Sequence, residues 1–128
     1  MSPEPLSAGG AEVDITPAPG VELMGYGARQ GVASGVHDPL FARALHLSSQ
    51  GREVLLVCAD LCLIAPAQAH AVRARISEST GIPPECMMIS CSHTHSGPDT
   101  GLGAWAMGQP EPEHVTTLFD GLARAACE

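Results

Sequence analysis

The pattern of apolar and polar positions in the first half of the chain predicts three strands. Residues 11–16 alternate between apolar and polar side chains, as a half-buried strand does, and the pattern stops at a proline. Residues 41–49 alternate in the same way, and residues 53–61 form a nearly continuous apolar run. The Gln50-Gly51 pair between them supplies a tight turn, which predicts a β-hairpin whose second strand is covered on both faces.

The second half of the chain predicts a helix, a strand and a closing helix. Apolar residues recur at three- and four-residue spacing over residues 66–79, and Gly81 then offers a C-terminal cap. An apolar run predicts a strand over residues 86–92, and an amphipathic stripe predicts a last helix over residues 111–126. Because strand, helix and strand form a crossover unit, the strands on either side of the first helix should lie parallel in one sheet.

These elements together predict an α/β fold with a mixed sheet, in which a β-hairpin feeds a parallel β-α-β unit and the helices pack on the sheet. Residues 1–10 are rich in proline, serine and glycine, so we expect a flexible lead-in before a domain that comprises residues 11–128. In residues 17–39, glycines and prolines are too irregularly placed for a helix or a long strand. A loop of this length inside a compact domain usually has a functional reason.

Length, charge and cysteine content limit the classes of function. The 128 residues suffice for one core, and the formal net charge of -8 argues against nucleic-acid binding, which needs clustered lysine and arginine. The first residues lack the positive charge and apolar stretch of a secretory signal, and no run approaches the roughly 18 apolar residues of a membrane span. The five cysteines form no Cys-x-x-Cys pair, so we expect reduced thiols in a cytoplasmic protein.

Polar residues with metal-binding chemistry follow two of the predicted strands. Asp60 lies at the end of one strand, and His93 and His95 follow the next. Ligand sites in parallel sheets gather beyond the carboxyl ends of the strands, so these side chains are expected to meet. On extended backbone, residues two apart point to the same side at a separation of about 6.5–7 Å. Both imidazoles could therefore face one metal ion or one substrate, with Asp60 as the acceptor for a ring nitrogen.

A His-x-His pair also occurs in ordinary surface loops, so the surrounding residues matter. Residues 92–98 read Ser-His-Thr-His-Ser-Gly-Pro, a polar and tightly bent stretch directly after a buried strand, which is a favoured place for function. This heptapeptide resembles the His-Thr-His-Ser-Gly-Pro signature of the neutral and alkaline, non-lysosomal ceramidase family. Residues 11–17 and 23–27 resemble that family's opening strand and its Met-Gly-Tyr loop, and residues 40–45 and 57–61 resemble its next two strands.

The resemblance implies zinc-dependent hydrolysis of an N-acyl amide, with a ceramide-like lipid as the substrate. In that case His93 matches the family's first zinc ligand, and His95 matches the neighbouring histidine that contacts the substrate or the developing oxyanion. Gly25 matches the loop glycine that approaches the substrate headgroup. Trp105, the only tryptophan, is a candidate for lining an acyl-chain pocket, although a single tryptophan is more often part of the packing.

The same resemblance implies that further ligands are needed. In the family a second histidine, a glutamate and a tyrosine lie downstream of the heptapeptide, so we expect this chain to be the N-terminal portion of a larger catalytic domain. One alternative is a non-catalytic, truncated relative that binds a partner or pairs with itself as a homo-oligomer. A third is a metal-independent hydrolase that uses Ser96, a nearby histidine and Asp60, but the sequence has no Gly-x-Ser-x-Gly elbow.

Overall fold

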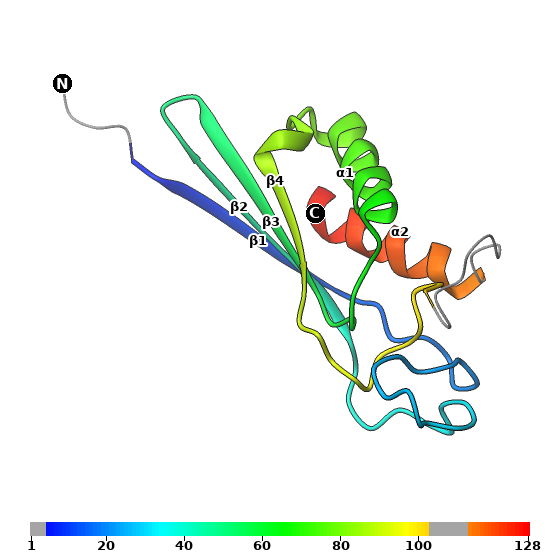
Figure 1. Cartoon of the computed structure of the whole chain (residues 1–128). Coiled ribbons are helices and arrows are strands. Elements are labelled where there is room, and N and C mark those ends of the chain that lie inside the picture. Colours follow the sequence, from blue (N-terminus) through cyan, green and yellow to red (C-terminus); the bar gives the residue numbers. More distant parts are fainter. Residues whose placement is uncertain (1–4, 103–112) are drawn as a thin grey trace.

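A four-stranded sheet forms the body of the protein in a computed structural model, which describes residues 5–102 and 113–128 (Figure 1). Its strands, in chain order and in order across the sheet, are β1 (Ser7–Asp14), β2 (Phe41–Ser49), β3 (Arg52–Ala59) and β4 (Met87–Cys91). The first three strands pair antiparallel, and β3 pairs parallel with β4. The predicted mixed sheet, with a hairpin feeding a parallel pair, is therefore confirmed.

The hairpin turn forms where the sequence places it. Gln50 and Gly51 have φ values of 54° and 70°. Positive φ at both central residues is the conformation of the type I′ turn, whose twist matches that of the flanking strands.

The predicted start of the first strand is wrong. β1 begins at Ser7 rather than at residue 11, and its first residues pair with the far end of β2, from Ser7 opposite Ser48 to Gly10 opposite Leu45. Residues 7–10 therefore belong to the sheet and not to a flexible lead-in. Small, exposed residues gave no alternating pattern there, and the pairing comes from backbone hydrogen bonds to a long neighbouring strand.

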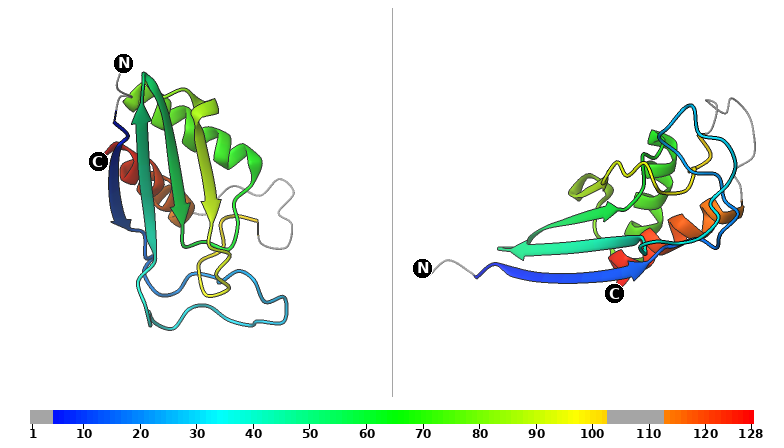
Figure 2. Two further views of the ribbon diagram at one scale, coloured as in Figure 1. Left: turned by 90° about the vertical axis from the view of Figure 1, so that its left-hand side faces the viewer. Right: turned by 90° about the horizontal axis from the view of Figure 1, so that it is seen from below.

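Two long helices cover one face of this sheet (Figure 2). They are α1 (Pro66–Thr80) and α2 (Glu113–Cys127), and the short 3-10 helix η1 (Pro84–Cys86) precedes β4. Helix α1 ends at Gly81, whose φ of 79° provides the predicted left-handed cap. The stripe predicted for the last helix is fully buried, and it consists of Val115, Leu118, Leu122 and Ala125.

Among the described residues, only one face of the second hairpin strand, β3, is covered. The expectation that both faces are covered is therefore wrong. In β3, Leu55 and Val57 are each 1% exposed, whereas Val54 is 42% exposed. Both helices pack on the side of Leu55 and Val57, so the other face of the sheet carries apolar residues in contact with solvent. Leu45 and Met88 are further exposed residues of this uncovered face.

The loops that follow β3 and β4 lie at one end of the sheet, beside the long loop of residues 17–39 (Figure 2). This is the edge at which parallel strands present their carboxyl ends, where ligand sites are common. Within the described part of the chain, no helix is both long and apolar enough to span a membrane.

Candidate metal centre

The segment after β4 is fixed by backbone hydrogen bonds to the segment after β3. The N–H of Ser92 donates to the carbonyl of Ala59 at 2.9 Å, and the N–H of His93 donates to the carbonyl of Leu61 at 3.0 Å. His93 itself has a φ of 62°. A non-glycine residue in this left-handed region is uncommon and is typical of functional sites, where the surrounding structure holds it in place.

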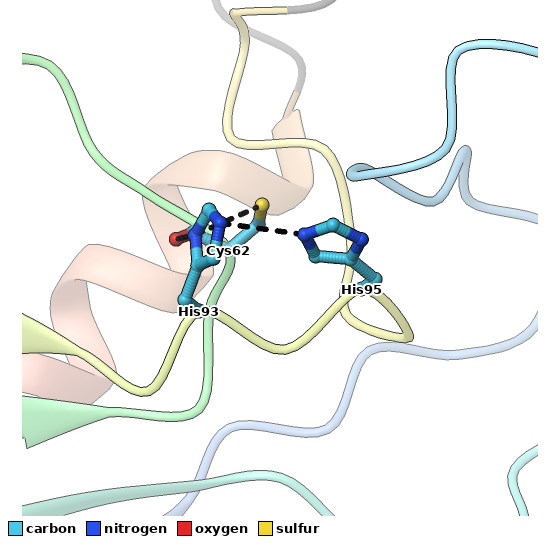
Figure 3. Close-up of side chains that lie close together, drawn as sticks. All are labelled: Cys62, His93 and His95. Carbon is cyan, nitrogen blue, oxygen red and sulfur yellow. Dashed lines mark hydrogen bonds between the residues drawn. The ribbon is translucent and has the colours of Figure 1, made fainter.

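The two imidazoles meet, as predicted (Figure 3). The Nε2 atoms of His93 and His95 are 3.4 Å apart, and the ring centroids are 4.9 Å apart with an angle of 78° between the planes. The reason given from the sequence is wrong, however, because His93 is not extended. Its left-handed conformation turns the chain, and this turn lets the two rings approach more closely than two side chains on one face of a strand.

The acceptor for the His93 ring is a backbone carbonyl. Nδ1 of His93 lies 2.8 Å from the carbonyl oxygen of Cys62 and 3.6 Å from the Cys62 sulfur. The shorter contact to the stronger acceptor assigns the proton of the neutral ring to Nδ1. The lone pair is then on Nε2, which points to His95, and this is the tautomer that a metal ligand needs.

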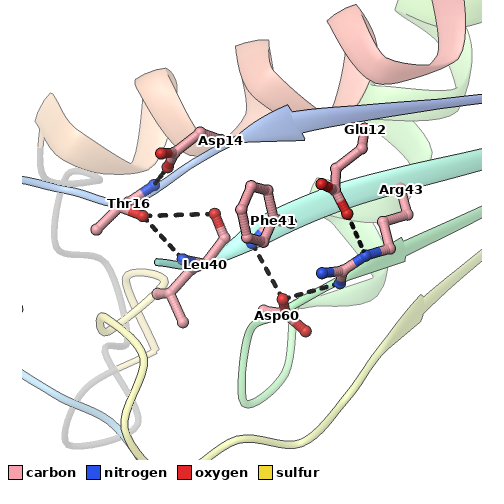
Figure 4. Close-up of polar contacts among 7 residues, drawn as sticks. All are labelled: Glu12, Asp14, Thr16, Leu40, Phe41, Arg43 and Asp60. Carbon is pink, nitrogen blue, oxygen red and sulfur yellow. Dashed lines mark hydrogen bonds and ion pairs between the residues drawn. The ribbon is translucent and has the colours of Figure 1, made fainter. Parts of the chain in front are cut away.

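The prediction that Asp60 accepts this hydrogen bond is wrong (Figure 4). Its Oδ2 accepts from the N–H of Phe41 and from the guanidinium of Arg43, each at 3.0 Å. Arg43 also donates to Glu12 at 2.6 Å, and the hydrogen bond to Asp60, followed by that to Glu12, raises the pKa of Arg43 above its usual value. Asp60 therefore ties the sheet edge together and does not orient either imidazole.

The long loop packs directly on His95. A Cβ atom built on Gly25 would lie 2.4 Å from Cγ of His95, and the φ of Gly25 is 114°. Only glycine fits here, because both the close approach and the conformation exclude a side chain. The ring of Tyr26 meets the ring of His95 edge to face, with centroids 4.9 Å apart. The predicted site residue Gly25 therefore lies at the site, in contact with His95.

Arg29 fastens the same loop to the heptapeptide. Its guanidinium donates to the carbonyls of His95 at 2.8 Å and Met24 at 3.4 Å, and it lies 5.0 Å from the centroid of the Tyr26 ring. The N–H of Met24 donates to the carbonyl of Gly97 at 3.1 Å. No sequence pattern singled out Arg29, because its shorter hydrogen bond goes to a backbone carbonyl 66 residues away.

The segment after the heptapeptide is anchored to α1, and to the residues before it, by two buried polar residues that the sequence analysis missed. Gln68 donates to the carbonyl of Thr100 at 2.8 Å, and the hydroxyl of Thr100 donates to the carbonyl of Leu63 at 2.8 Å. Gln68 is 7% exposed and Thr100 is 0% exposed. A glutamine inside a helical stripe was the available signal, since burial of its amide requires partners.

Two predicted roles remain, those of Trp105 and Ser96. Trp105, the candidate for lining an acyl-chain pocket, lies outside the described residues. The N–H of Ser96 donates to Thr94 at 3.2 Å, and Asp60 is bound to Arg43 and Phe41. Within the described part of the chain, the geometry therefore gives no serine, histidine and aspartate relay.

Known proteins resemble this chain over most of its length. The sequence profile of the family described as neutral/alkaline non-lysosomal ceramidase, N-terminal, matches residues 7–121. This chain belongs to that family. The match includes the strands, the long loop and the heptapeptide, so the resemblance read from the sequence is confirmed.

The relatives of this ceramidase-family chain are much longer proteins. It is 34% identical over 131 residues to a neutral ceramidase of Pseudomonas aeruginosa, covering 94% of this chain and 19% of the relative. It is 33% identical over 102 residues to a neutral ceramidase of Oryza sativa, covering 77% of this chain and 13% of the relative. The crystal structure of the Pseudomonas aeruginosa enzyme superposes with a TM-score of 0.80 and 29% identity, covering 97% of this chain and 21% of that one. The chain thus spans about a fifth or less of the proteins that it matches.

Proposed function

We propose that this chain is the metal-binding N-terminal portion of a zinc-dependent hydrolase that cleaves the N-acyl amide of a ceramide-like lipid. The observation that carries the proposal is the convergence of the two imidazole Nε2 atoms at 3.4 Å, within a chain of the ceramidase family. Members of this family named among its relatives are neutral ceramidases.

The residues fit a zinc ion on geometric grounds. The Nδ1 contact with the carbonyl of Cys62 leaves the lone pair of His93 on Nε2, where it faces inward and can bind zinc at about 2.0–2.1 Å. Nε2 of His95 lies 3.4 Å from that atom, so the second imidazole would lie directly beside the ion. When bound, zinc lowers the pKa of a water ligand to about 7 and polarises a carbonyl.

The side chains of this chain then have separate roles. His93 holds the ion, and its orientation comes from the carbonyl of Cys62. His95 lies beside it and is placed to donate to the oxygen of the amide as negative charge develops there. The loop at Gly25 approaches the same ring without a side chain, so its backbone lies directly against His95.

The test is the metal content of the purified chain. The variant His93→Ala is expected to lose bound zinc, whereas His70→Ala, a matched control on the exposed surface of α1, is expected to keep it. Equal zinc in the two variants, measured by elemental analysis after dialysis, would contradict the assignment. Cleavage of a fluorescent N-acyl sphingosine then tests the substrate class.

A second candidate function is a non-catalytic module that docks through the sheet. The uncovered face favours it, because Leu45, Val54 and Met88 are 41%, 42% and 54% exposed. Exposed apolar patches often mark interaction sites. A stable oligomer in light scattering, combined with no bound metal, would favour this candidate over the hydrolase.

A further inference from the structure

The side chain of Tyr26 connects the long loop to the candidate site through its ring. The centroid of this ring lies 4.9 Å from that of His95, with an angle of 82° between the planes. The guanidinium carbon of Arg29 lies 5.0 Å from the same centroid. Tyr26 is nevertheless 60% exposed. Burial in the core therefore does not explain why this ring lies where it does.

The backbone contacts of residue 95 leave the rotation of its imidazole open. The carbonyl of His95 accepts from Arg29 at 2.8 Å, which fixes the main chain. The close approach of Gly25 is to Cβ, Cγ and Cδ2 of His95, at the end of the ring nearest the backbone. Rotation about the Cβ–Cγ bond of histidine is soft, with broad preferred angles. The direction of Nε2 therefore needs a contact with the face or edge of the ring itself.

Two ring contacts meet this need. The rings of His93 and His95 lie at 78° to each other with their Nε2 atoms 3.4 Å apart (Figure 3), and the ring of His93 is itself fixed by the carbonyl of Cys62. The ring of Tyr26 supplies the second contact, in the edge-to-face arrangement that aromatic pairs prefer. An imidazole that turned about its Cβ–Cγ bond would lose this arrangement and carry its Nε2 away from His93.

We propose that Tyr26 is a positioning residue, which sets the rotation of the His95 imidazole so that its Nε2 faces that of His93. This inference rests on the proposed function, in which His95 donates to the amide oxygen beside an ion held by His93. A donor stabilises developing charge best when it is already aimed at the place where the charge appears. Arg29 in turn holds the Tyr26 ring, because a guanidinium over an aromatic face is attracted to it.

The competing explanation is that Tyr26 is an exposed loop residue whose ring rests on the site without orienting it. Tyr26→Leu removes the ring, whereas Tyr26→Phe keeps the ring and removes the hydroxyl. The matched control is Phe41→Leu. Phe41 also has a guanidinium 5.0 Å from its ring centroid, that of Arg43, but in the part of the chain that the structure describes its ring does not contact either imidazole.

The experiment is nuclear magnetic resonance of the purified chain, dialysed against a chelator, with circular dichroism to confirm that each variant is folded. The nuclear Overhauser effect between the ring protons of His93 and His95 reports how the two imidazoles face each other. The unmodified chain, Phe41→Leu and Tyr26→Phe are expected to keep this signal. In Tyr26→Leu the equilibrium should shift away from the facing orientation by about two- to twelvefold, the factor that a typical aromatic pair supplies, and the signal should weaken.

Two results would overturn the role of the Tyr26 ring. One is a signal of equal strength in Tyr26→Leu and Phe41→Leu, and the other is a loss in Tyr26→Phe as large as that in Tyr26→Leu. Absence of the signal from the folded, unmodified chain would also overturn it, because the rings would then not face each other. The chain is free of metal in this experiment, so the outcome is separate from that of the proposed function, which fails if His93→Ala retains zinc.

Discussion

Gly25→Ala tests whether the long loop sets the position of His95. The new Cβ would lie 2.4 Å from Cγ and 2.7 Å from Cβ of the His95 side chain, whereas carbon atoms pack at about 3.5–4.0 Å. Since the overlap includes the Cβ of His95, rotation of the ring cannot relieve it, and the loop or residue 95 must shift by about 1 Å. The φ of 114° at Gly25 adds backbone strain, for which about 1–3 kcal/mol is typical.

These two effects can be separated by matched glycines of the same loop. Gly20 has a φ of 101° and no atom within 4 Å of a built Cβ, so Gly20→Ala introduces strain without overlap. Gly27 likewise has no atom within 4 Å, and Gly27→Ala introduces neither effect. Both Gly20→Ala and Gly25→Ala should lower Tm, by about 3–5 °C per kcal/mol in a chain of this length.

The displacement of His95 should appear only in Gly25→Ala. A disturbed ligand environment costs about 10–100-fold in metal affinity, and we expect that loss in a zinc titration against a chromophoric chelator. Nuclear magnetic resonance of the His95 ring protons supplies a readout that needs no metal, since their shifts should change in this variant alone. Unchanged ring shifts, together with a zinc affinity equal to that of Gly27→Ala, would refute the packing argument.

Three further changes test other parts of the structure. Arg29→Met removes the guanidinium contacts that join the long loop to the heptapeptide, and it should weaken zinc binding about tenfold in the same titration. Gly121→Ala in α2 would place a Cβ 2.4 Å from Cγ2 of Ile15. The cost of this overpacking should exceed the gain in helix propensity that alanine brings. The free energy of unfolding, measured by urea denaturation, should therefore fall by about 1 kcal/mol. Thr16→Val removes the hydroxyl hydrogen bond that, together with the Thr16 N–H, lowers the pKa of Asp14. The carboxyl of Asp14 should then titrate closer to 3.8 by NMR. The lowered pKa of Asp14 stabilises the folded state above that pH, and this stabilisation is lost on acidification. It should be smaller in the variant.

Local patterns predicted the elements well where each depends on nearby residues. The turn at Gln50 and Gly51 and the end of α1 at Gly81 follow from backbone conformations that few residues adopt. The buried stripe of α2 follows from helical spacing, and the parallel pairing of β3 with β4 follows from the crossover rule. The first strand was placed too late because its pairing depends on β2, and the small residues at its start carry no period.

The contacts of the site were harder to predict, because they depend on which residues the tertiary structure brings together. The sequence placed Asp60 beside the histidines, but Arg43 on the adjacent strand faces the same carboxylate and binds it. The carbonyl of Cys62 then serves as the acceptor for His93. Carbonyl oxygens occur at every residue, so no composition or spacing could have identified this one.

The two histidines are held by different parts of the fold, and this difference predicts how the centre responds to change. His93 is fixed by hydrogen bonds to the residues that follow β3, and those residues continue directly from the core strand. His95 is fixed by the long loop, through the face of Gly25 and the guanidinium of Arg29. The loop is attached near its ends by the bond from the Ile15 N–H to the Leu40 carbonyl. Changes in the loop should therefore move His95 and leave His93 in place, so that metal binding weakens while the hydrogen bonds between the ends of β3 and β4 are kept.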